Sequence, residues 1–184
     1  MRRIVAIILL ALLLPQGALA DIDLLAESKL IVAARAGELD RVATILQRKG
    51  NPDEIDQNSK TALIYAALAG NEDMIELIIK HRARVDYRDE AGNTALFYAA
   101  ENGHVEAAEL LLKMGAGIDV ANRQGMTPLI VAAGRGHAYV LPMLLARGAD
   151  PSRRDFTGRT ALMWAEWSRK SAAARALRKA GVRE

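Results

Sequence analysis

The stretch Thr127-Pro-Leu-Ile-Val-Ala-Ala is one of four versions of a single heptapeptide pattern. The others are Thr61-Ala-Leu-Ile-Tyr-Ala-Ala, Thr94-Ala-Leu-Phe-Tyr-Ala-Ala and Thr160-Ala-Leu-Met-Trp-Ala-Glu, and the interval from each version to the next is constant. A fifth version, Ser28-Lys-Leu-Ile-Val-Ala-Ala, precedes Thr61 by the same interval. Repetition at one fixed period is typical of arrays in which each unit is one supersecondary element. The sequence therefore predicts a repeat solenoid.

One unit can be interpreted residue by residue. Thr127 is a suitable helix N-cap, and Pro128 follows at the first helical position, where its missing N–H costs nothing. Gly136 can end this helix because glycine tolerates positive φ. A second helix is clearest at 104–113, and the stretch 116–126 then makes an extended excursion with a turn near Gly125. Each unit is thus predicted to be helix, turn, helix and finger-like loop.

This pattern resembles the ankyrin repeat, whose unit is a β-turn followed by two helices with a T-P-L-H-x-A-A opening. The resemblance covers residues 24–184 and implies an all-α repeat solenoid with β-turn fingers. Five helix-turn-helix units, each of about 33 residues, are expected. They lie at approximately 24–52, 53–85, 86–118, 119–151 and 152–184. The first and last units would be caps.

Several residues depart from the family pattern. The motif His is replaced by apolar residues at Ile64, Phe97, Ile130 and Met163, so apolar packing must substitute for its hydrogen bonds. Arg82 stands where Gly115 and Gly148 close the second helix, which predicts either a strained turn or a different one. Pro142 should kink its helix or delay its start. Counted from Gly50, the first finger is one residue shorter than the others.

Residues 1–20 have the features of a cleaved signal peptide. Arg2 and Arg3 are followed by the apolar run 4–14, and Ala18-Leu19-Ala20 is a small-x-small cleavage site. The run is too short to span a bilayer as a helix, although an uncleaved N-terminal anchor is the alternative interpretation. We therefore expect a periplasmic protein consisting of residues 21–184, with no membrane anchor after cleavage and with onward secretion left open.

Composition narrows the class of function. The chain has no cysteine, which excludes disulfides, thiolate catalysis and Cys-ligated metal sites. Of the 25 basic residues, Arg2 and Arg3 leave with the leader, so 23 remain against 22 acidic residues. The charge is uneven, because residues 21–150 carry −5 and residues 151–184 carry +6. This dipolar pattern favours either a protein partner of complementary charge or a well-solvated last unit, and it argues against nucleic acid.

The resemblance implies that fingers and first helices form a concave surface that binds another protein. On that surface, residue types enriched at interface hot spots are the leading candidates. The predicted partner-binding residues are Arg88, Glu90, Tyr98, Glu101, Arg123, Gln124, Met126, Arg135, Phe156, Arg159 and Trp167. Tyr98 and Trp164 equally suit a role in packing against the next repeat, and any single arginine equally suits a solvated surface.

No catalytic or cofactor motif is present. His104 and His137 occupy equivalent positions of two units, which suits structural packing better than shared metal ligation. We therefore expect a non-enzymatic adaptor without cofactor or metal, monomeric when free. Within that class three roles stay open: an inhibitor or immunity protein of a secreted toxic enzyme, an accessory partner that stabilises a periplasmic enzyme, for example in oxidative-stress defence, and an envelope scaffold.

Overall fold

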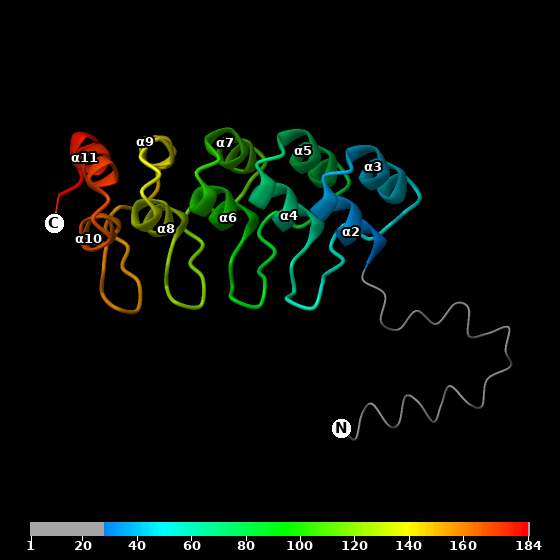
Figure 1. The fold of residues 1–184 in the computed structure, drawn as a ribbon, viewed down its shortest axis with the longest axis horizontal. Coiled ribbons are helices and arrows are strands. Elements are labelled where there is room, and N and C mark those ends of the chain that lie inside the picture. The colour runs from blue at the N-terminus through cyan, green and yellow to red at the C-terminus, as the bar shows by residue number, and fades with distance from the viewer. Residues whose placement is uncertain (1–27, 184) are drawn as a thin grey trace, which may run out of the picture.

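The computed structural model describes residues 28–183, in which ten helices stack as five pairs (Figure 1). The first helices of the pairs form one row, called here the inner helices: α2 (Lys29–Ala36), α4 (Ala62–Ala69), α6 (Ala95–Asn102), α8 (Pro128–Arg135) and α10 (Ala161–Trp167). The second helices form the outer row: α3 (Leu39–Gln47), α5 (Glu72–Lys80), α7 (Val105–Lys113), α9 (Val140–Ala146) and α11 (Ser171–Lys179). The predicted all-α repeat fold is confirmed.

The inner helices begin and end as the repeated pattern predicts. The Thr127 hydroxyl accepts a hydrogen bond from the Ile130 backbone N–H at 3.3 Å, with Pro128 in the first turn. Thr61, Thr94 and Thr160 cap their helices in the same way. Gly136 ends α8 with φ of 93°, a conformation that would strain a residue with a Cβ. The first four inner helices therefore carry both signals, whereas α10 ends at Ser168 and Arg169 takes the left-handed conformation with φ of 56°.

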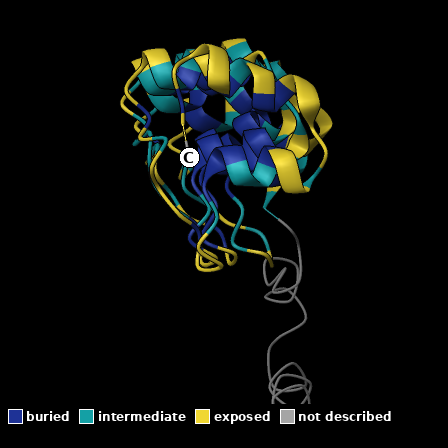
Figure 2. Cartoon of the chain, turned by 90° about the vertical axis from the view of Figure 1, so that its left-hand side faces the viewer, coloured by how far each residue is buried: buried dark blue, intermediate teal, exposed yellow. Residues whose placement is uncertain are grey.

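Alanines let the inner helices pack closely. Ala66, Ala99 and Ala132 are fully buried, and the larger core side chains such as Leu96 and Leu129 lie on the same helices. The buried side chains form two clusters, one in the first three units and one in the last three, and the exposed residues gather on the outer helices and the loop tips (Figure 2). Because a unit buries its apolar face only against its neighbours, the stack is the source of stability.

Four loops project from the helical layer, at 48–61, 81–94, 114–127 and 147–160, and we call them the fingers (Figure 1). An aspartate at the base of one finger reaches the next finger. Asp53 accepts from the Arg84 backbone N–H at 2.9 Å, and Asp86 accepts from Gly117 at 3.0 Å. These bonds recur at the repeat spacing and fix the register between units.

The departures from the family pattern have distinct structural outcomes. Arg82 keeps the left-handed conformation that a glycine would take, with φ of 68°. Lys49 does the same with φ of 65°, so the first finger has the length of the others and the expectation of a shorter one is wrong. In the fourth unit α9 begins at Val140, two residues later than the equivalent of Val105, so Pro142 delays the helix start.

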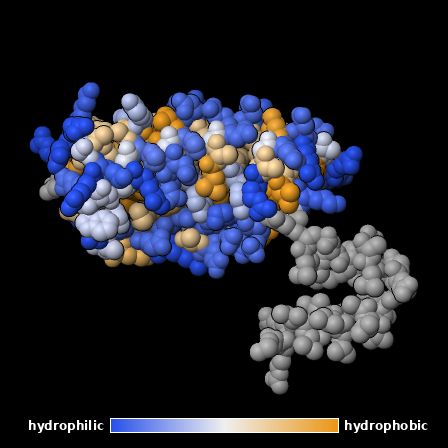
Figure 3. Space-filling view, in the orientation of Figure 1, coloured by the Kyte–Doolittle hydropathy of each residue, from blue (hydrophilic) through white to orange (hydrophobic). Residues whose placement is uncertain are grey.

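The predicted leader at residues 1–20 lies outside the residues that the structure describes. Within residues 28–183, no helix combines the length and apolar character needed to cross a membrane. On the face seen in Figure 3, hydrophilic residues predominate and hydrophobic ones form narrow strips.

The closing residue of α5 provides a stability test. Replacing Arg82 by glycine removes the left-handed strain, so we expect Arg82→Gly to raise the free energy of unfolding by about 1 kcal/mol. Gly115→Ala, at the equivalent position with no atom near the added Cβ, should lower it by a similar amount. Urea denaturation followed by circular dichroism measures both. A loss of stability in Arg82→Gly would contradict the strain argument.

Candidate protein-binding face

Each finger is organised by one buried or half-buried Asp or Asn. Asp155 accepts from the Thr157 and Arg159 backbone N–H groups, each at 2.9 Å, through one carboxylate oxygen. The equivalent residues Asp56, Asp89 and Asn122 also accept backbone N–H groups of their own fingers. The side chain thus pairs donors that the tight turn leaves without backbone partners.

In three fingers the second carboxylate oxygen binds an aromatic side chain of the following inner helix. The Tyr98 hydroxyl donates to Asp89 at 2.6 Å, and the Trp164 indole N–H donates to Asp155 at 2.8 Å. Tyr65 and Asp56 form the same bond at 2.6 Å. These bonds tie each finger to its helix and set the angle between them.

These bonds also affect ionisation of the carboxylates. Burial of Asp155 opposes its ionisation, but hydrogen bonds from Thr157, Arg159 and Trp164 outweigh burial and hold its pKa below the usual value. The pKa of Asp56 is lowered in the same way, with burial outweighed by bonds from Tyr65, Lys60 and Asn58. The charged form of the carboxylate is therefore the one the finger requires.

The fourth unit departs from this arrangement. Its finger residue is Asn122, and Val131 stands where the second, third and fifth units carry an aromatic side chain. The Asn122 amide group donates instead to Asn93 at 2.9 Å and to Gln124 at 2.8 Å. The finger is therefore fastened to its neighbour, and the space above Val131 is left without a ring.

The fingertips are joined by backbone hydrogen bonds. Glu90 donates to Asn58 at 3.2 Å, Arg123 donates to Ala91 at 3.0 Å, and Phe156 donates to Gln124 at 3.0 Å. These bonds occur at one register in successive fingers. The backbones of the four fingertips are therefore linked in a row, and this row fixes the spacing of the side chains that the tips carry.

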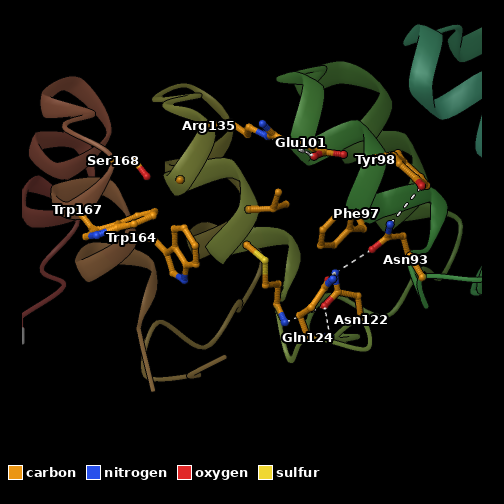
Figure 4. A pocket seen from close by; sticks show the side chains of 14 residues that line it. Asn93, Phe97, Tyr98, Glu101, Asn122, Gln124, Arg135, Trp164, Trp167 and Ser168 are labelled. Carbon is orange, nitrogen blue, oxygen red and sulfur yellow. Dashed lines mark hydrogen bonds and ion pairs between the residues drawn. The ribbon is translucent and has the colours of Figure 1, made fainter. Parts of the chain in front are cut away.

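A groove with a volume of about 630 Å³ lies over α6, α8 and α10 and the adjoining fingers (Figure 4). Figure 4 shows Trp164 and Trp167 along one side and Phe97 and Tyr98 along the other. The lining comprises Ala91, Asn93, Phe97, Tyr98, Glu101, Asn122, Gln124, Met126, Val131, Gly134, Arg135, Trp164, Trp167 and Ser168. The lining is mixed, with aromatic and aliphatic side chains beside amide groups and the charged residues Glu101 and Arg135.

A charged pair crosses the upper rim of the groove. The Arg135 guanidinium donates to the Glu101 carboxylate, with its Nε at 3.2 Å. His137 of the same unit lies 2.7 Å from the Glu101 backbone carbonyl through its Nε2. Since the Arg135 side chain is 61% exposed, the pair is partly solvated and remains accessible to a partner.

The last unit contributes an aromatic wall. Trp164 and Trp167 meet edge to face with ring centroids 5.0 Å apart, and Trp167 is 64% exposed. The Arg159 guanidinium carbon lies 5.2 Å from the Trp167 ring centroid and 5.7 Å from that of Trp164. Guanidinium stacking therefore places Arg159 against this tryptophan wall.

The structure brings six of the predicted partner-binding residues into the groove lining: Tyr98, Glu101, Gln124, Met126, Arg135 and Trp167. Tyr98 is only 8% exposed, so its main role is to hold the finger. The other five lie on fingers: Arg88, Glu90, Arg123, Phe156 and Arg159. Arg88 donates to the Gly92 and Ala121 carbonyls and stitches two fingers together. Phe156 is 81% exposed at a fingertip.

The sequence analysis missed the residues that open the groove. Val131 and Gly134 form part of its lining between larger neighbours, and Asn122 adds an amide beside those of Asn93 and Gln124. A comparison of the fourth unit with the third and fifth at matched positions contains this signal. The residue types alone could not reveal the groove. A small side chain indicates an opening only when the equivalent positions of the neighbouring units carry large side chains.

The histidines take structural positions. His104 Nε2 lies 3.0 Å from the Leu68 carbonyl, and His137 makes the equivalent contact one unit later. Each ring sits against the end of the preceding inner helix and fills the space beside Gly70 or Gly103. Among the described residues, no three His, Cys, Asp or Glu side chains are placed to hold a metal ion.

The sequence matches the model of one known protein family. The family described as "Ankyrin repeats (3 copies)" matches residues 30–123 and 114–183. The chain belongs to the ankyrin-repeat family. A search of the curated proteins finds no match to this sequence. Ankyrin repeats are protein–protein interaction modules and are generally non-catalytic, so the groove and fingers form a candidate protein-binding face.

The buried hydrogen bond between Tyr98 and Asp89 should contribute more to the stability of the array than the half-buried bond between Tyr65 and Asp56. We expect Tyr98→Phe to lower the free energy of unfolding by about 1 to 3 kcal/mol, because Asp89 and Asn93 lose a buried partner. Tyr65→Phe should cost less, because Asp56 is half-buried and water can replace the hydroxyl. Urea denaturation of the two variants tests this order. Equal losses would show that burial does not set the strength of the bond.

The lowered pKa of Asp155 predicts acid sensitivity. Its bonds stabilise the fold above the ordinary carboxyl pKa of 3.8, and this contribution is lost as the pH falls through the lower folded-state value. Asp155→Asn, which mimics Asn122, should therefore lose less stability than the parent between about pH 5 and pH 2. Thermal unfolding across this range, with Glu106→Gln as an exposed control, measures the difference. Parallel curves for Asp155→Asn and the parent would contradict the assignment.

Proposed function

We propose that this ankyrin-repeat protein is an exported, non-catalytic adaptor that binds one partner protein through a concave face formed by the inner helices and fingers. The observation that carries the proposal is the groove over α6, α8 and α10, where predicted interface residues from three units converge. It combines exposed aromatic surface at Trp167 with a solvated charge at Arg135, and such residues dominate binding energy at protein interfaces.

Rigidity of the face supports the same proposal. Three sets of hydrogen bonds hold the fingers. Finger carboxylates accept from the finger backbone, Tyr and Trp side chains of the inner helices donate to the same carboxylates, and backbone groups join neighbouring tips. A surface ordered before binding loses little conformational entropy when it binds. Side chains at the tips, such as Arg123 and Phe156, extend from this fixed platform.

Export to the periplasm is part of the proposal and rests on the sequence of residues 1–20. In that compartment the adaptor would act on a secreted or periplasmic protein. We propose inhibition of a toxic enzyme, as by an immunity protein, as the first role to test. Support of a periplasmic enzyme and scaffolding in the envelope are the other outcomes.

The experiment is an affinity capture from periplasmic extract with residues 21–184 as bait. The test variant carries Arg123→Glu, Arg135→Glu and Trp167→Ala. The matched control carries Lys80→Glu, Arg175→Glu and Tyr139→Ala, which make the same types of change on the outer helices or at their ends. Circular dichroism confirms that both fold. We expect one dominant protein to be retained by the parent and the control and lost, by about tenfold or more, with the test variant.

Assays of the captured protein then separate the roles. Loss of its activity on binding supports an inhibitor, and unchanged activity with slower inactivation supports an accessory partner. Retention of the same protein by the test variant would contradict the concave-face proposal. Retention of cell-wall material or lipid instead of a protein would favour the scaffold.

A further inference from the structure

The inner helices can be compared position by position along the array. One row of equivalent residues reads Tyr65, Tyr98, Val131 and Trp164, and a second reads Leu68, Glu101, Gly134 and Trp167. Among the second to fifth units, both rows carry their small residue in the fourth; in the first row the first unit also has a valine, Val32. The groove lies where these two gaps coincide, with the larger side chains of the third and fifth units as its walls.

Gly134 is not required by the backbone of its helix. It lies inside α8 and is absent from the residues with positive φ, unlike Gly136 at the helix end. A Cβ added at Gly134 would meet the Trp164 ring at 3.4 Å, so an alanine nearly fits. Glycine inside a helix lowers stability, which means that the opening beside Trp164 is kept at a cost to the fold.

The chemistry of the walls defines what fits. Aromatic rings flank the gap on both sides, at Phe97 and Tyr98 and at Trp164 and Trp167 (Figure 4). The Asn122 side chain donates to Asn93 and Gln124 and accepts backbone N–H groups of its own finger, so this amide is satisfied within the chain. The space suits a flat apolar ring, which would stack or meet edge to face with its neighbours as Trp164 and Trp167 do.

The charge at the rim adds a second requirement. Arg135 is already paired with Glu101. Arg159 stacks on the tryptophan wall and donates to Thr157, and it forms no ion pair within residues 28–183. A carboxylate brought beside the occupying ring would meet this cation, whereas an added cation would be repelled.

We propose that the groove is a socket for one aromatic side chain of the partner protein, carried beside a carboxylate that pairs with Arg159. The partner would complete the fourth unit by supplying the ring that Val131 lacks. This inference rests on the proposed function, since it specifies the partner's chemistry at the same face. It further implies that filling the socket from within the chain prevents binding.

Small probes test the socket without the partner. The chain contains two tryptophans, Trp164 and Trp167, and both line the groove, so their indole N–H signals in nitrogen-15 NMR report on it directly. We expect indole-3-propionate to shift these signals saturably. Tryptamine, which has the same ring with a cation, and propionate, which has no ring, should bind at least about tenfold more weakly.

Two filling variants control for the site. Val131→Tyr places the side chain found in the second and third units, and Gly134→Leu places the one found at Leu68. Each should weaken binding of indole-3-propionate by about tenfold or more, while Tyr139→Val, at the N-terminal end of α9, leaves it unchanged. Either filling variant suffices if the other fails to fold, as judged by circular dichroism.

The outcomes separate this inference from the proposed function. Absence of a saturable shift, or equal binding to the parent and a folded filling variant, would overturn the socket. Equal binding of tryptamine and indole-3-propionate would overturn the requirement for a carboxylate. If Val131→Tyr still captures the same protein that the Arg123, Arg135 and Trp167 triple variant loses, the socket is wrong and the concave-face adaptor stands.

Discussion

The bond between a finger carboxylate and its own inner helix is the interaction on which the rest of the structure depends. In Asp89 one oxygen accepts from the finger backbone and the other accepts from the Tyr98 hydroxyl at 2.6 Å. One side chain thereby satisfies the turn and fixes the direction in which the finger leaves the helical layer. This chain has apolar residues such as Ile64 and Phe97 at the position of the family's motif His. The hydrogen bond from the aromatic side chain to the finger carboxylate attaches the finger to the helix, which apolar packing cannot do.

The fold could be predicted from the sequence because its signals are local and repeated. Thr127, Pro128 and Gly136 specify the start and end of a helix by capping chemistry alone, and recurrence at a constant interval places the units side by side. From the sequence, the turn at Arg82 is open to two interpretations, and the structure has the strained one, with φ of 68°. The expected shorter first finger is wrong, because Lys49 and not Gly50 takes the left-handed conformation that closes α3.

The candidate site could be predicted only in part. Exposed residue types typical of interfaces led to Trp167, Arg135 and Arg159, which the structure gathers beside one groove. Tyr98 fits the same description by type, yet its hydroxyl bonds and 8% exposure make it a support for the finger. Tyr98 supports the finger because its hydroxyl donates to Asp89, earlier in the chain. The sequence does not show this pairing, since it forms only when the finger folds back onto the helix.

The groove shows how a repeat protein can create a specific site by omission. Val131 and Gly134 stand where the second, third and fifth units carry larger side chains, and Asn122 replaces the carboxylate whose aromatic partner is missing. Because Asn122 bonds instead to Asn93 of the preceding unit, the finger keeps its position although its own tie is lost. The fourth unit therefore gives up local packing while its neighbours hold it in register. An array tolerates this loss since stability is shared along the stack, and an interior unit is the place where neighbours on both sides can supply walls for the opening.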